Sequence, residues 1–106
     1  MDMSTDECIK KTIDFINLLN QNGLDISEAY IFGSAARGEM KEFSDIDIAV
    51  VSSEFEGILF HDIKKISKYR RMIDLRLEIH PFSLNEIQSD PPAFFEIIQK
   101  EGIRVC

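Results

Sequence analysis

The feature that most constrains the fold is an almost uninterrupted apolar run, Ile46-Asp47-Ile48-Ala49-Val50-Val51. A short run of this kind predicts a β-strand, with apolar side chains directed to both faces of a sheet. Only its N-terminal end carries acidic residues. A strand that is apolar on both faces needs cover on both, which predicts a sheet with helices packed against it.

Further strands and helices are predicted on either side of this run. Helical spacing and capping residues predict helices from Ser4 to Gly23, from Phe60 to Arg70, after Ser83 and over residues 93–100, and a short helix or turn over residues 34–40. Strands are predicted over residues 29–32 and 72–80, with a short terminal strand over residues 103–105. Residues 1–106 therefore predict a single α/β (α+β) domain with a mixed sheet and flanking helices.

The segment over residues 72–80 alternates between apolar and polar side chains. Its polar face would carry Asp74, Arg76, Glu78 and His80, and Pro81 would end the strand. A loop and a helix separate this segment from the run at Ile46. The two strands are therefore expected to run parallel through a crossover connection.

Charge and composition exclude several classes of protein. Nineteen Asp and Glu against 12 Lys and Arg give a net charge of -7, which disfavours a stand-alone nucleic-acid binder or a protein of anionic membrane surfaces. No apolar run approaches the length of about 20 residues that spans a bilayer, and the N-terminal residues do not resemble a signal peptide. The only cysteines, Cys8 and Cys106, predict reduced thiols in a cytoplasmic protein.

Two acidic residues stand at the start of the apolar run. Asp45 and Asp47 are two positions apart, so on a strand their carboxylates share one face, about 6–7 Å apart. Like charges held so close are unfavourable without a cation between them. Mg²⁺ prefers one or two carboxylates together with substrate phosphates, and paired metals assist phosphoryl displacement. The pair therefore predicts a magnesium site.

A glycine-rich segment, Gly33-Ser34-Ala35-Ala36-Arg37-Gly38, follows the strand over residues 29–32. Gly33 would let a phosphate approach the backbone, and Ser34 offers a hydroxyl and a backbone N–H at the start of a helix. Arg37 would add a charge-assisted contact, although an exposed ion pair is an equal alternative for it. Beside the acids, this cradle is what nucleotidyl transfer from a nucleoside triphosphate requires.

A third carboxylate is expected to complete the site or to accept a proton. Asp74 and Glu78 compete for this role, since both belong to the polar face of the strand over residues 72–80. In a parallel pair the N-terminal end of that strand lies level with Asp45 and Asp47. This register favours Asp74, with Glu78 about 13 Å further along and second in rank.

At this point the chain resembles the nucleotidyltransferase superfamily that includes polymerase beta, on the motifs Gly33-Ser34, Ala36-x-Gly38 and Ser44-Asp45-x-Asp47. In its short length the chain also resembles the minimal nucleotidyltransferases of that superfamily. The resemblance implies that Ser34 contacts the triphosphate, that Asp45 and Asp47 hold two magnesium ions and that Asp74 is the third acid. It also implies a protein partner, since members serve as antitoxins of helical HEPN ribonucleases and some adenylylate that toxin on tyrosine.

The expected activity is transfer of a nucleoside monophosphate, AMP from ATP, to a hydroxyl acceptor such as a partner tyrosine. The alternative is a binding module with weak catalysis, and an antibiotic-modifying enzyme ranks last because the chain lacks an acceptor domain. The sequence does not determine the oligomeric state, and a homo-oligomer is one of the alternatives. His61 and His80 are interpreted as structural, and Phe94, Phe95, Ile97 and Ile98 as core or as an exposed patch.

Overall fold

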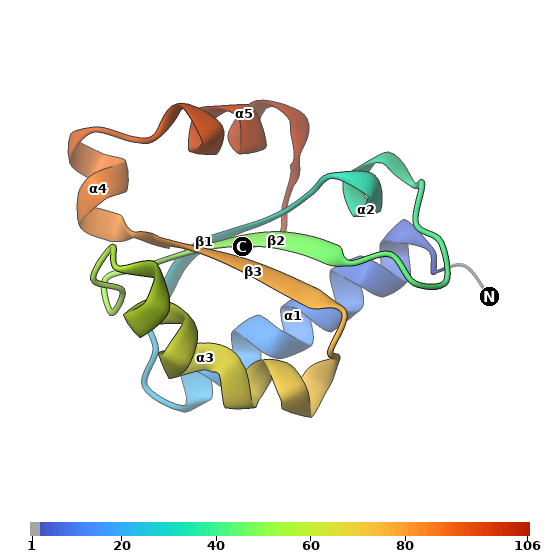
Figure 1. Cartoon of the computed structure of the whole chain (residues 1–106), viewed down its shortest axis with the longest axis horizontal. Coiled ribbons are helices and arrows are strands. Elements are labelled where there is room, and N and C mark those ends of the chain that lie inside the picture. Colours follow the sequence, from blue (N-terminus) through green and yellow to red (C-terminus); the bar gives the residue numbers. More distant parts are fainter. Residues whose placement is uncertain (1–2) are drawn as a thin grey trace.

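The computed structural model describes residues 3–106, which form a mixed four-stranded sheet with helices on both faces (Figure 1). The strands are β1 (Ile26–Phe32), β2 (Ile46–Ser52), β3 (Leu77–Ser83) and β4 (Ile103–Arg104), in the spatial order β3-β2-β1-β4. The helices are α1 (Thr5–Gln21), α2 (Ser34–Arg37), α3 (Leu59–Ile73), α4 (Leu84–Ser89) and α5 (Ala93–Glu101). The predicted fold class, a mixed sheet with flanking helices, is confirmed.

The apolar run from Ile46 to Val51 lies in β2, one of the two inner strands of the sheet. It pairs antiparallel with β1 and parallel with β3, so the predicted crossover through α3 is confirmed. Ile48 and Val50 belong to the core cluster beneath α1 and α3, whereas Ala49 and Val51 pack in a second cluster with Phe95 of α5. Figure 1 shows these two layers on opposite sides of the sheet. The strand is thus covered on both faces, as its composition predicts.

Local signals fix the ends of several elements where the sequence predicts them. The Ser4 side chain accepts from the backbone N–H of Glu7 at the start of α1. Ser83 and Glu86 form a reciprocal capping box at the start of α4. These contacts satisfy backbone donors that a helix cannot pair internally.

The boundaries predicted for the third strand are wrong. Residues 72 and 73 belong to α3, Asp74 is the C-cap of that helix, and β3 begins only at Leu77. Helical spacing explains the difference, because Ile73 continues the buried stripe of Ile66 and Tyr69 at intervals of three and four. Up to Ile73, the helical period therefore prevails over the alternating one.

The predicted end of that strand at Pro81 is also wrong, since Pro81 lies within β3. β3 is an edge strand with β2 on one side only. A proline lacks the backbone N–H, and an edge strand tolerates this where the nitrogen faces away from the neighbouring strand. The alternation itself holds from Leu77 to His80, with Leu77 and Ile79 buried and Glu78 exposed.

The cysteines and the lengths of the helices also bear on the predictions from the sequence. Cys8 is buried, Cys106 is exposed, and both are free thiols. Among residues 3–106, no helix combines the length and the apolar character that crossing a membrane would require.

Candidate functional site

Asp47 occupies the N-terminal end of β2, on the face of the sheet that α5 covers further along. Its register partner on β1 is Phe32, the last residue of that strand, and Gly33 follows directly. Gly33 has a positive φ of 68°, and a Cβ built there would lie 2.7 Å from Oδ2 of Asp47. A side chain at position 33 would therefore displace the carboxylate, so the glycine makes room for Asp47.

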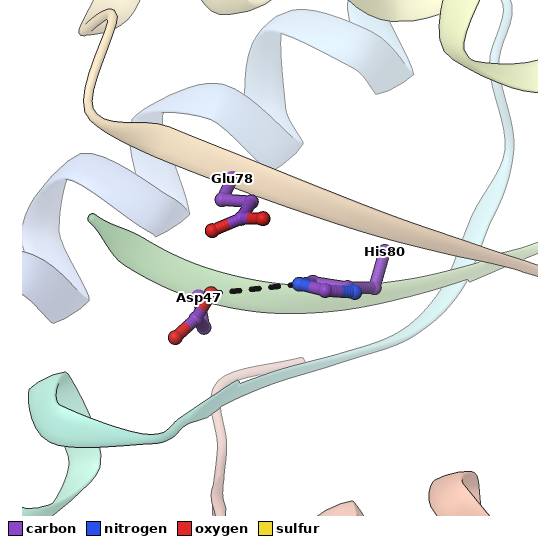
Figure 2. A group of neighbouring side chains, drawn as sticks. All are labelled: Asp47, Glu78 and His80. Atoms are coloured by element: carbon purple, nitrogen blue, oxygen red, sulfur yellow. Dashed lines mark ion pairs between the residues drawn. The ribbon is translucent and has the colours of Figure 1, made fainter.

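Glu78 is the register partner of Asp47 on the other side, across the parallel pair of β2 and β3. His80 follows two residues later on the same face of β3. One ligand atom from each of Asp47, Glu78 and His80 lies within 4.8 Å of the others. Figure 2 shows the three side chains turned toward one another from the two neighbouring strands.

The imidazole of His80 is held in place by aromatic rings. Its centroid lies 4.9 Å from that of Phe32 and 5.9 Å from that of Phe94. Its Nε2 lies 3.5 Å from Oδ1 of Asp47, the pair joined by a dashed line in Figure 2. Among residues 3–106, this nitrogen is the one buried side-chain nitrogen or oxygen with no hydrogen-bond partner. An ion or a water bound there would satisfy this nitrogen.

The donor set fits a divalent cation. Ligand atoms about 2.1 Å from one ion lie about 3 Å apart when adjacent and about 4.2 Å apart when opposite. The separations among Asp47, Glu78 and His80 need only small side-chain movements to reach those values. Two carboxylates and an imidazole are also ordinary ligands of divalent metals in proteins.

Asp45 lies one residue before β2 and is exposed to solvent. Its neighbour Ile46 pairs with Leu77, and the backbone N–H of Ile46 donates to the carbonyl of Arg76 over 2.7 Å. Asp45 is not part of the three-residue group.

The expected position of Asp74, on the third strand beside Asp47, is wrong. Asp74 caps α3 and forms an ion pair with Lys11 of α1 at 3.1 Å. Arg76 donates to it from Nε over 3.1 Å, from Nη2 over 2.9 Å and from its backbone nitrogen over 2.8 Å. These donors, the Arg76 side chain above all, hold the pKa of the Asp74 carboxyl well below its usual range. The register argument that favoured Asp74 therefore selects Glu78.

The glycine-rich segment forms the predicted short helix, α2, with Gly33 as its N-cap. The Ser34 hydroxyl lies 3.5 Å from the sulfur of Met40. Arg37 pairs with Glu39, and its side chain is largely exposed. Its guanidinium thus forms the surface ion pair that was one of its two expected roles, while its side chain also borders the pocket described next.

A pocket of about 550 Å³ opens between the Gly33 turn and α5. Its lining consists of Phe32, Gly33, Arg37, Phe94, Ile97, Ile98 and Glu101. Phe95 and Ile98 are buried, whereas Phe94 and Ile97 are about half exposed. The four apolar residues of α5 therefore divide between core and open surface, so each of the two sequence interpretations holds for part of the set. The volume lies in the usual range for small-molecule pockets.

Sequence reasoning missed His80 and the pocket wall. His80 was interpreted as structural because no metal-ligand spacing surrounds it. The signal that was present is the i, i+2 relation to Glu78, which puts both side chains on one face of a strand. Phe94 and Ile97 could not be assigned to the site from sequence, because their distance in the chain from Gly33 conceals the contact.

Comparisons with known proteins identify the family to which the chain belongs. The sequence model of the family described as polymerase beta, nucleotidyltransferase, matches residues 14–106. Among curated proteins, none matches the chain.

Two solved structures share its fold. One, from Sulfolobus solfataricus and assigned to the nucleotidyltransferases, has a TM-score of 0.67 and 21% identity, covering 94% of this chain and 80% of its own. The other, from a toxin-antitoxin crystallised with AMP-PNP, has a TM-score of 0.58 and 21% identity, covering 92% and 72%. Because the family model spans most of the sequence, this chain belongs to the polymerase beta nucleotidyltransferase family.

Proposed function

We propose that this protein transfers AMP from ATP to a hydroxyl group on a partner protein. The observation that carries the proposal is the register pairing of Asp47 with Glu78, with Asp47 against the Gly33 turn, which also lines a pocket. Family membership supports nucleotidyl transfer as the class of reaction.

In this proposal Asp45, Asp47 and Glu78 hold two magnesium ions, and Glu78 takes the role first expected of Asp74. When bound, the ions polarise the phosphate oxygens and lower the pKa of the attacking hydroxyl. Gly33 keeps the Asp47 carboxylate in place by leaving room for it. The fixed carboxylates reduce the reorganisation that the site needs when substrate binds.

The pocket between the Gly33 turn and α5 would receive the nucleotide. Phe94 and Ile97 offer an apolar surface for the base, and Arg37, which also lines the pocket, would contact the phosphates together with Ser34 of α2. Binding would require Arg37 to exchange Glu39 for a phosphate. The exchange costs little free energy, because an exposed ion pair of this kind contributes only about 0–1 kcal/mol to stability.

The reaction forms a bond between the acceptor oxygen and the α-phosphorus of ATP. The bond from that phosphorus to the bridging oxygen breaks, and pyrophosphate leaves. Glu78, whose carboxylate is exposed, accepts the proton of the hydroxyl. The products are an AMP ester of the acceptor and pyrophosphate.

The acceptor is proposed to be a tyrosine of a helical HEPN-type toxin, with this chain as its cytoplasmic antitoxin. The fold likeness to a toxin-antitoxin crystallised with AMP-PNP, an ATP analogue, supports this. So does an exposed apolar surface at the start of α3, where a hollow of about 520 Å³ is lined by Leu59, Phe60, Ile63, Lys64 and Ser67. Leu59 and Phe60 are 65% and 75% exposed, which is typical of a surface that contacts another protein.

The same surface favours a second candidate function, a binding module that neutralises its partner without catalysis. The two candidates differ in what the carboxylates do. A binding module would keep its affinity for the partner when Asp45 or Asp47 is replaced by asparagine. A transferase that acts as antitoxin through modification would lose its protective effect.

The test is incubation of the purified protein with Mg²⁺ and the protein encoded by the neighbouring gene. ATP labelled on the α-phosphate should label that partner, and ATP labelled on the γ-phosphate should not. Asp45→Asn and Asp47→Asn should abolish the labelling, whereas Asp14→Asn on the exposed face of α1 should not. Tight binding of the partner without label transfer, unchanged in both site variants, would support the binding module instead.

A further inference from the structure

His80 is the one residue of the three-residue group that a carboxylate-based magnesium site does not call for. We propose that its Nε2 is a ligand of the cation held by Asp47 and Glu78, and that this nitrogen makes the site prefer Mn²⁺ over Mg²⁺. The inference rests on the proposed function, since the same carboxylates hold the cation in both.

The environment of His80 Nε2 supports its role as a ligand. Nε2 of His80 is buried and has no hydrogen-bond partner, and the atom that it faces is Oδ1 of Asp47 at 3.5 Å. That separation is longer than a good N–H···O hydrogen bond of about 2.9 Å. It is close to the roughly 3 Å between adjacent ligands of one ion. The two atoms form no hydrogen bond, and a shared ion would satisfy both of them.

Two aromatic side chains fix the orientation of the His80 ring. Phe32 and Phe94 pack against the imidazole from β1 and α5. These contacts restrict the rotation of the ring. Figure 2 shows the imidazole directed at Asp47. A ligand held in this way loses little conformational freedom on binding an ion.

The ligand atoms of the site favour Mn²⁺ over Mg²⁺. Mg²⁺ strongly prefers oxygen ligands, whereas imidazole nitrogen suits first-row transition metals. Mn²⁺ accepts carboxylate oxygens and also binds imidazole, so a site of two carboxylates and one histidine favours it over Mg²⁺. A site of carboxylates alone would make this distinction less strongly.

The experiment measures binding of Mn²⁺ and Mg²⁺, each without nucleotide, to the full chain. We expect pulsed electron paramagnetic resonance of the Mn²⁺-loaded protein to show coupling to a directly bound ¹⁴N nucleus. We expect His80→Asn to remove this coupling and to lower the ratio of Mn²⁺ to Mg²⁺ affinity about tenfold. The matched control is His61→Asn, since His61 pairs with Glu56 on the exposed surface and should affect neither quantity.

Two outcomes overturn the inference, and they bear differently on the proposed function. If Mn²⁺ binds without nitrogen coupling and the affinity ratio is unchanged in His80→Asn, the ligand role fails while the carboxylate site stands. If neither ion binds the wild-type protein, with or without ATP, the inference and the proposed function fail together. The wild-type spectrum needs no variant, so the test holds even if His80→Asn does not fold.

Discussion

Gly33 and Asp47 meet where β1 ends and β2 begins, and a Cβ on Gly33 would lie 2.7 Å from the Asp47 carboxylate oxygen. Real Cβ atoms do not approach so closely, so either the carboxylate or the backbone must move. Gly33→Ala should therefore weaken Mn²⁺ binding at least tenfold and lower AMP transfer by the same factor or more. Titration calorimetry of the variant measures the first effect.

The matched control for this change is Gly23→Ala. Gly23 has a similar positive φ of 85°, but a Cβ there meets no atom within 4 Å. Both substitutions put a Cβ on a residue of positive φ and so carry backbone strain, which is larger at Gly33 because its ψ of -148° lies in a region nearly exclusive to glycine. Only Gly33→Ala also displaces Asp47. Equal loss of metal binding in the two variants would show that strain alone is responsible.

Asp74 is predicted to stabilise the fold in a pH-dependent manner. Its pKa in the folded state lies below the value of about 3.9 in an unfolded chain. The contribution is therefore fully present above about pH 4 and is lost as pH falls toward the folded-state pKa. Relative to wild type, Asp74→Asn should lower the free energy of unfolding by about 1–2 kcal/mol at pH 7.

Urea denaturation of both proteins between pH 7 and pH 3 checks this. The difference in unfolding free energy should stay constant down to about pH 4 and shrink below it. A difference that is independent of pH throughout, or that grows in acid, would exclude the ion pairs with Lys11 and Arg76 as the source of the effect.

Ile97 is predicted to contact the nucleotide. It lines the pocket from α5 and is 52% exposed, so a polar replacement removes little buried apolar surface. Ile97→Glu puts a negative charge beside the expected phosphates and should weaken binding of a non-hydrolysable ATP analogue about tenfold. Fluorescence titration with a labelled analogue gives the affinity.

Ile13→Glu is the control for Ile97→Glu. Ile13 is 40% exposed on α1, a helix of the opposite layer. It should leave nucleotide affinity unchanged. If both substitutions weaken binding equally, net charge rather than the pocket controls the affinity.

Much of the fold was predictable because local patterns agreed with tertiary packing. The apolar run at Ile46 required cover on both faces, and the loop and helix after it required a parallel partner strand. Capping by Ser4 and by Ser83 depends on residues three positions apart, so the chain alone reveals it.

The start of β3 was not predictable for a physical reason. Ile73 satisfies both the helical stripe of α3 and the alternation of a strand, and only packing against the core decides between them. The strand begins at Leu77 and not at residue 72, and Glu78, four residues after Asp74, occupies the register position that Asp74 was expected to occupy. The pocket wall was equally hard to predict. Its residues on α5 are about 60 positions from Gly33 in the sequence, and only the tertiary fold brings them together.

The central claim is that Glu78, and not Asp74, joins Asp47 in the catalytic site. The most direct test compares Mn²⁺ binding and AMP transfer to the partner in Glu78→Gln and Asp74→Asn at pH 7, per mole of folded protein. We predict that Glu78→Gln weakens Mn²⁺ binding at least tenfold and lowers transfer at least a hundredfold, while Asp74→Asn leaves both within about twofold of wild type. The reverse pattern, with metal binding and transfer lost in Asp74→Asn and retained in Glu78→Gln, would contradict the account.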